Sequence, residues 1–185
     1  MIILTFHAIL TLVWKETHVF KAIKVTEGEK MIRRAIPEDI PAIEQLLRQV
    51  LKVHYNGRPD IFKKVGYKYT PEELYDIIAD ETTPVFVYVE EDGLVAGHCF
   101  CQIIDRPEQP HANPYKTLYI DDLCVNENYR KKGIGTKLYQ YTLEYARANG
   151  FHNVTLHAWE CNPEAVSFYK ALGMKIQQYT FEEVL

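Results

Sequence analysis

The residues with the clearest chemical potential lie between Leu118 and Leu143, where an apolar strand leads through a basic turn into a helix. The turn contains three basic residues and two glycines, in the run from Arg130 to Gly135. Apolar residues then recur at helical spacing, so the glycines stand where a helix begins and its first amides lack intrahelical partners. Such amides, the positive end of the helix dipole and basic side chains all favour phosphate oxygens. The stretch therefore predicts a pyrophosphate-binding loop.

Two familiar phosphate-binding loops do not fit this turn. The P-loop requires a Gly-Lys-Ser/Thr ending, and the dinucleotide fingerprint requires a third glycine three residues further on. Neither is met, because Thr136, Lys137 and Leu138 follow Gly135. The alternative to phosphate binding is a glycine-containing turn before a surface helix with a solvated basic edge.

The wider pattern favours the first interpretation. An apolar strand ending at Val125, a spacer with Tyr129, the Arg130-x-x-Gly-x-Gly135 turn and a helix are followed downstream by Asn162 and Tyr169. This combination resembles the GCN5-related N-acetyltransferase superfamily, from about Met31 to the C-terminus. The resemblance implies an α/β (α+β) fold, with a mixed central sheet of about six to seven strands flanked by about four helices. It also implies acetyl-CoA as the acetyl donor and no metal.

The same resemblance implies which residues bind the donor. Backbone groups of Leu123, Cys124 and Val125 would follow the pantetheine arm, and one amide of this run would polarise the thioester carbonyl as an oxyanion hole does. The pyrophosphate would be bound by the turn and first helical residues, namely Arg130, Lys131, Lys132, Gly133, Ile134, Gly135 and Thr136.

Two residues of the last predicted helix complete the pattern. Tyr169 follows Asn162 by seven residues, and its phenol can donate a proton to the coenzyme A thiolate. Its alternative role is that of a core aromatic residue beside Phe168. Asn162 precedes a proline, so it is also an ordinary helix cap, and both of its roles are compatible.

The general base is predicted among carboxylates. Asp121 and Asp122 are adjacent in an otherwise apolar strand, and burying an unpaired carboxylate is costly. Because successive side chains of a strand point to opposite faces of the sheet, at most one of the two carboxylates faces the site unless a bulge intervenes. The surrounding run is similar to the polyamine and thialysine acetyltransferase branch, which favours Asp121, with Glu160 as second choice. An ion pair with a nearby Lys or Arg is the alternative role, and His98, His111 and His157 are taken as ordinary residues.

The resemblance implies direct acetyl transfer to a primary amine within a ternary complex, and the acceptor is expected to be most simply a small molecule. Acetylation of a protein N-terminus or lysine is a rival within enzymes. A non-catalytic acyl-CoA-binding module is a rival from another class. Dimers are common in the superfamily, so a homodimer stays open.

Composition limits the other classes. The 185 residues are 47% hydrophobic and 25% charged, as expected for one globular domain. A net charge of −4 gives no reason to expect a nucleic-acid partner and suits a cationic acceptor better. The four cysteines match no zinc spacing, although Cys99 and Cys101 leave a metal pair open. Reduced thiols fit a cytoplasmic location.

The chain divides at about Met31. Residues 1–30 contain an apolar run too short to span a membrane, which takes about 20 residues, and they lack the features of a signal peptide. Because Glu27–Lys30 can be encoded like a bacterial ribosome-binding sequence, we expect residues 1–30 to be an N-terminal extension, as a translated leader or an added strand or helix. The resemblance implies that residues 31–185 form an N-acetyltransferase domain.

Patterning within the domain predicts its elements. Residues 54–70 read as irregular, and the resemblance implies that they shape the acceptor pocket, although a packed surface loop is the alternative. The predicted strands are 31–36, 84–89, 94–104, 118–125, 152–159 and 175–181, and the predicted helices are 37–54, 70–80, 133–149 and 162–172.

Overall fold

The computed structural model describes residues 30–185, so the leader prediction lies, apart from Lys30, outside the described residues. The described elements, in chain order, are β1 (Met31–Arg34), η1 (Pro37–Asp39), α2 (Ile40–Gly57), α3 (Pro71–Ala79), β2 (Val85–Val89), β3 (Val95–Arg106), β4 (Tyr115–Val125), η2 (Glu127–Tyr129), α4 (Ile134–Ala148), β5 (Asn153–Leu156) and α5 (Pro163–Ala171).

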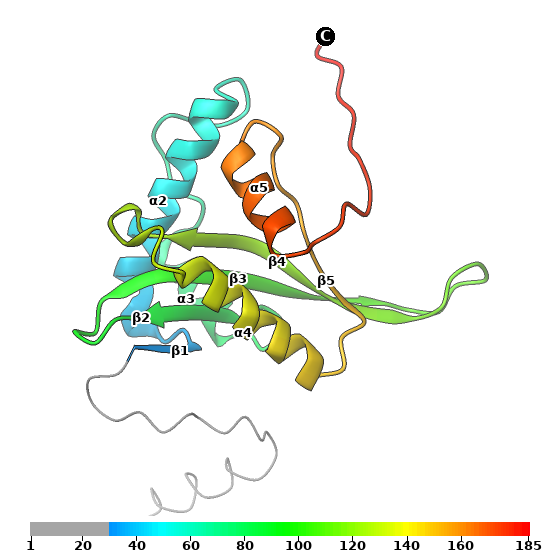
Figure 1. Cartoon of the computed structure of the whole chain (residues 1–185), viewed down its shortest axis with the longest axis horizontal. Helices are drawn as coiled ribbons and strands as arrows, with labels where there is room; N and C mark the ends of the chain where they lie inside the picture. Colours follow the sequence, from blue (N-terminus) through cyan, green and yellow to red (C-terminus); the bar gives the residue numbers. More distant parts are fainter. Residues whose placement is uncertain (1–29) are drawn as a thin grey trace, which may run out of the picture.

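The strands form one mixed sheet in the order β1-β2-β3-β4-β5. The first four are antiparallel neighbours, and β5 pairs parallel with β4 after the α4 crossover. Figure 1 shows α2 and α3 on the far side of this sheet and α4 across its near side. The predicted mixed α/β sheet flanked by four helices is therefore confirmed for the described part of the chain.

Both faces of the sheet are covered, which explains why all five residues of β2 are buried. Val85, Val87 and Val89 belong to the core that α2 and α3 close. Phe86 and Tyr88 alternate with them and belong to the core beneath α4.

Local signals position the start of α3 as expected, whereas α2 continues to Gly57, beyond its predicted end at His54. Thr70 accepts a hydrogen bond from the Glu73 amide at 3.2 Å, and the Glu73 carboxylate accepts one from the Thr70 amide at 2.7 Å. This capping box, with Pro71 at the first helical position, fixes the start of α3. It thereby fixes the end of the preceding irregular segment, which carries Lys68 and Tyr69.

Three strand predictions need correction. The described sheet has five strands, and the strand predicted at 175–181 is absent from the described structure because no neighbouring strand pairs with that segment. β5 ends at Leu156 and not at Trp159, because the ladder with β4 stops there. β4 begins at Tyr115 and not at Leu118, since Tyr115–Thr117 pair with the extended end of β3.

Candidate active site

A β-bulge places the two adjacent carboxylates of β4. Phe100 pairs with Asp122 and Cys101 with Ile120, so Asp121 is the additional residue between two ladder positions. A bulge interrupts the alternation of side chains along a strand. Both carboxylates can therefore serve one site. The sequence predicted that this would require a bulge between them, and the bulge is present.

The two carboxylates meet at one ammonium group, that of Lys68. The Lys68 Nζ lies 2.7 Å from Asp121 Oδ2 and 3.4 Å from Asp122 Oδ2. The Tyr69 hydroxyl lies 3.3 Å from the same Asp121 oxygen. Attraction to Asp122 and the hydrogen bond to Asp121 overcome the effect of burial and raise the pKa of Lys68. The ion pair that was the alternative role of the aspartates is thus present. The same contact shows that the two carboxylates can bind an alkylammonium group.

Asp122 is also anchored from inside the sheet. Its Oδ1 lies 3.1 Å from Nε2 of His98, a residue of β3 with no exposed surface. Burial opposes ionisation of Asp122, but the hydrogen bond from His98 and the charge of Lys68 together lower its pKa. Lys68 and Tyr69 come from the 54–70 segment that was expected to shape the acceptor pocket, although no role was predicted for Lys68. Sequence reasoning missed His98, which was taken as an ordinary residue. The available signal was a histidine in an apolar strand that pairs with the strand of the two aspartates.

The strands β4 and β5 pair only over part of β4. Their ladder ends at Ile120 and Leu156, whereas β4 continues to Val125. Figure 1 shows the two strands diverging beyond this point. Leu123, Cys124 and Val125 therefore pair with β3 but have no described strand partner on the β5 side of β4. Backbone groups at such an edge need hydrogen bonds from elsewhere, and the Val125 carbonyl oxygen already accepts one from Arg130. This edge suits the extended amide chain of a pantetheine arm.

The thiol of Cys124 does not contribute chemistry to this edge. It points into the core, 3.6 Å from the Leu46 carbonyl oxygen, and burial raises its pKa to about 12. Cys99 and Cys101 are likewise buried, with their sulfurs 3.8 Å apart. Within residues 30–185 no group of three or more candidate metal ligands occurs.

The predicted phosphate loop leads into α4. Gly133 is the N-cap residue, with φ of +78°, and no side chain caps the helix. The amides of Ile134, Gly135 and Thr136 thus stand at an uncapped helix start, although the Ile134 side chain is buried. Lys131 also has a positive φ, of 61°, as tight anion-binding turns do.

The basic side chains of the loop differ in their placement. Arg130 is turned back, with its Nε donating to the Val125 carbonyl oxygen at 3.2 Å. The Lys132 ammonium lies 4.5 Å from the centre of the Tyr129 ring. Gly135 has a packing role that the sequence did not reveal, because a Cβ there would lie 3.2 Å from Cζ of Phe168 in α5.

Helix α5 brings the remaining predicted residues. Asn162 Oδ1 accepts a hydrogen bond from the Ala165 amide at 3.2 Å, which confirms the capping role. Tyr169 is largely buried, and burial, assisted by Asp122 among other groups, raises the pKa of its phenol. Glu160 lies exposed in the turn before α5 and forms no ion pair or hydrogen bond with the described residues. Tyr169 thus lies close enough to Asp122 for this carboxylate to affect its pKa.

Comparison with known proteins identifies the family. The model of the acetyltransferase (GNAT) family matches residues 50–174. The chain belongs to this family. It is an acyltransferase, and the GNAT family uses acetyl-CoA as the acetyl donor. The start of α4, which has no side-chain cap, suits the pyrophosphate of acetyl-CoA. The edge of β4 beyond Ile120, which β5 does not pair with, suits the amides of its pantetheine arm.

The chain is also similar to individual members of the GNAT family and to a solved structure. It is 27% identical over 141 residues to N-alpha-acetyltransferase 50 of Danio rerio, covering 76% of this chain and 71% of that one. It is 35% identical over 88 residues to streptothricin acetyltransferase A of Bacillus subtilis, and the match covers 44% of this chain and 48% of that one. The solved structure of a tetramutant of the BH1408 protein from Bacillus halodurans is 30% identical in sequence and superposes with a TM-score of 0.81. The match covers 84% of this chain and 99% of that one.

Proposed function

We propose that this GNAT enzyme transfers the acetyl group of acetyl-CoA to a primary amine of a small cationic molecule, by direct attack within a ternary complex. The observation that carries the proposal is the ammonium group of Lys68 held by Asp121 and Asp122. Two carboxylates that bind one alkylammonium can bind another. A neutral or anionic acceptor would gain nothing from this pair.

Each site residue then has a chemical role. Asp121 takes the proton that the acceptor ammonium must lose before the nitrogen can attack. We assign this role to Asp121 because its side chain is 21% exposed, whereas the Asp122 side chain is 5% exposed. Asp122 is anchored by His98 and orients the cation. Tyr169 donates a proton to the leaving thiolate, and its raised pKa keeps it protonated at neutral pH.

The remaining residues bind the acetyl donor. Leu123, Cys124 and Val125 offer backbone groups to the pantetheine arm, and an amide among them polarises the thioester carbonyl. Asn162 contacts the same arm from the start of α5. The pyrophosphate is bound by the loop from Arg130 to Thr136, through its amides and its three basic side chains.

A protein N-terminus is the second candidate acceptor. It is favoured by the similarity to N-alpha-acetyltransferase 50, which extends over more of the chain than the similarity to streptothricin acetyltransferase A. An N-terminal amine is also a cation that the Asp121 and Asp122 pair would accept. The test must therefore include peptides beside small amines.

The experiment is release of coenzyme A thiol from acetyl-CoA, measured against polyamines, amino-acid derivatives, aminoglycosides and peptides with free N-termini. Wild type is compared with Tyr169→Phe, and Tyr179→Phe on the exposed C-terminal segment is the matched control. We expect turnover with one class of cationic amine, reduced at least about 100-fold by Tyr169→Phe and unchanged by Tyr179→Phe.

Two results would count against the proposal. Turnover restricted to peptides would assign the enzyme to N-terminal acetylation. Acetyl-CoA binding with no turnover of any acceptor would favour a non-catalytic module that retains the fold.

A further inference from the structure

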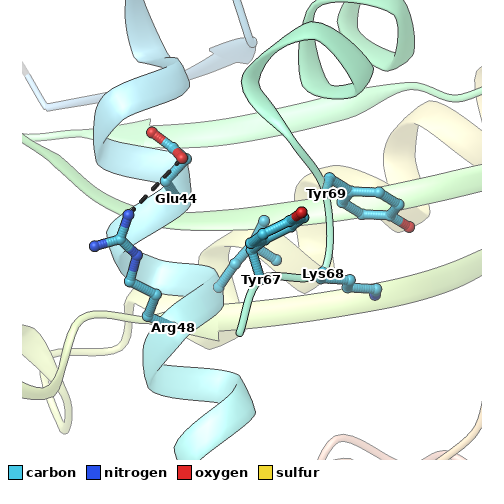
Figure 2. A pocket seen from close by; sticks show the side chains of 6 residues that line it. Glu44, Arg48, Tyr67, Lys68 and Tyr69 are labelled. Atoms are coloured by element: carbon cyan, nitrogen blue, oxygen red, sulfur yellow. Dashed lines mark ion pairs between the residues drawn. The ribbon is translucent and has the colours of Figure 1, made fainter. Parts of the chain in front are cut away.

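Lys68 reaches the candidate active site from the segment between α2 and α3, which is 53 residues away from Asp121 in sequence. Figure 2 shows the Lys68 and Tyr69 side chains extending to the same side, away from the Glu44–Arg48 ion pair on α2. The two residues directly precede the capped start of α3, so their backbone is held in place. The approach of Lys68 to β4 is therefore built into the fold.

The contact has the chemistry of a bound acceptor. The Lys68 side chain is a primary ammonium on a flexible alkyl stem, which is the acceptor class proposed above. Its nitrogen lies 2.7 Å from the carboxylate to which we assign removal of the acceptor's proton. Asp122, which also contacts this nitrogen, contributes to the raised pKa of Tyr169, the residue proposed to protonate the leaving thiolate. Lys68 is thus in direct contact with the carboxylate proposed as the base.

We propose that Lys68 is a self-acetylation site, modified on Nζ by the active site of its own chain. This inference rests on the proposed function, because it requires acetyl-CoA at the same centre. It assigns to Lys68 a reaction that a purely structural ion pair would not undergo.

The reaction balances without any further reactant. Asp121 takes one proton from the Lys68 ammonium, and the neutral nitrogen attacks the thioester carbonyl carbon. A carbon–nitrogen bond forms and the carbon–sulfur bond breaks. The thiolate takes the Tyr169 proton, Tyr169 recovers the second nitrogen proton, and the proton on Asp121 passes to solvent. The products are acetyl-Lys68, coenzyme A thiol and one released proton.

The surroundings of Lys68 permit this exchange. Its side chain is 35% exposed, so a proton and an external amine can both reach the site from solvent. A small hollow on the α2 side, lined by Tyr67, Lys68 and Tyr69 among others, encloses about 10 Å³, enough for about one water. An external amine that binds the two carboxylates must compete with the Lys68 ammonium, which already contacts both.

The test is incubation of the full chain with isotopically labelled acetyl-CoA, followed by digestion and mass spectrometry of each lysine peptide. Lys64, exposed in the same segment, is the internal control for uncatalysed acetylation. We expect Lys68 to be labelled at least about tenfold faster than Lys64, because it is held at the reacting centre. The rate should be independent of protein concentration, should fall in Asp121→Asn and should fall in the presence of a saturating external amine.

The outcomes separate this inference from the proposed function. Labelling of Lys68 no faster than Lys64, while the same preparation acetylates an external amine, overturns self-acetylation and leaves the function intact. A rate per chain that rises with protein concentration also overturns it, since a second copy would then be the catalyst. Absence of both Lys68 labelling and external turnover counts against both proposals.

Discussion

His98 in β3 and Asp122 in β4 face each other inside the sheet, with Nε2 and Oδ1 3.1 Å apart. His98 has no exposed surface and Asp122 is 8% exposed. The His98 Nδ1 has no hydrogen-bond partner among the described residues, so the contact with Asp122 is the one that satisfies this buried ring. The pair therefore contributes to folding as well as to the site, because an unsatisfied buried polar group costs about 1–3 kcal/mol.

Asp122→Asn should destabilise the fold by about 1–3 kcal/mol at pH 7, since a charged hydrogen-bond acceptor is lost beside a buried histidine. The pKa of Asp122 is lowered on folding from its ordinary 3.8. Its stabilising contribution is therefore present above pH 3.8 and is lost as the pH falls through the lower folded-state pKa. Urea unfolding at several pH values should show the wild-type and mutant free energies converging below about pH 4.

Asp105→Asn is the matched control for this measurement. Asp105 is an exposed residue of β3, and its carboxylate lies 3.7 Å from the Lys116 ammonium. We expect less than about 1 kcal/mol of destabilisation. If the two substitutions lowered the free energy of unfolding equally, the His98–Asp122 pair would contribute no more to stability than an exposed ion pair.

Gly135→Val should push α5 away from α4. A Cβ at residue 135 would lie 3.2 Å from Phe168 Cζ and 3.6 Å from Val125 Cγ2, so the larger side chain overpacks this contact by about 1–3 kcal/mol. Phe168→Ala removes the obstructing ring, and the double variant should be more stable than the sum of the single effects predicts. Thermal unfolding of the four proteins measures this coupling.

Gly133→Ala provides the contrasting case. Nothing lies within 4 Å of a Cβ at residue 133, but its φ of +78° costs a non-glycine residue about 1–2 kcal/mol. Because this cost is in the backbone, Phe168→Ala should not relieve it. Rescue of Gly133→Ala by Phe168→Ala would contradict the assignment of the two glycines to different roles.

The sequence predicted regular elements well and distant contacts poorly. The start of α4 after Gly133, the Asn162 cap and most of the strands followed from local periodicity and capping residues, which act over a few positions. The bulge at Asp121 and the approach of Lys68 depend on pairing between segments far apart, so no local pattern revealed them. Residues 175–181 have strand-like composition, but a strand needs a hydrogen-bonded neighbour, and the described sheet provides none.

Asp121→Asn should lower kcat/KM for a cationic amine by about 100-fold or more, because a positioned base contributes about 10²–10⁴ to the rate. Glu160→Gln should change it less than about twofold, since Glu160 lies exposed and makes no ion pair or hydrogen bond with the described residues. Steady-state kinetics of both variants with the same amine decides between the two carboxylates. A greater loss in Glu160→Gln would return the role of base to that residue.

The four cysteines should differ sharply in reactivity. Cys161 is exposed, whereas Cys99, Cys101 and Cys124 are buried. Burial raises the pKa of Cys124 to about 12, so at pH 8 only about one molecule in 10⁴ carries its reactive thiolate. A disulfide thiol reagent should therefore modify one thiol rapidly in the native protein and all four after unfolding. Cys161→Ser should abolish the rapid phase, and rapid modification of a second thiol in that variant would contradict the burial of the strand cysteines.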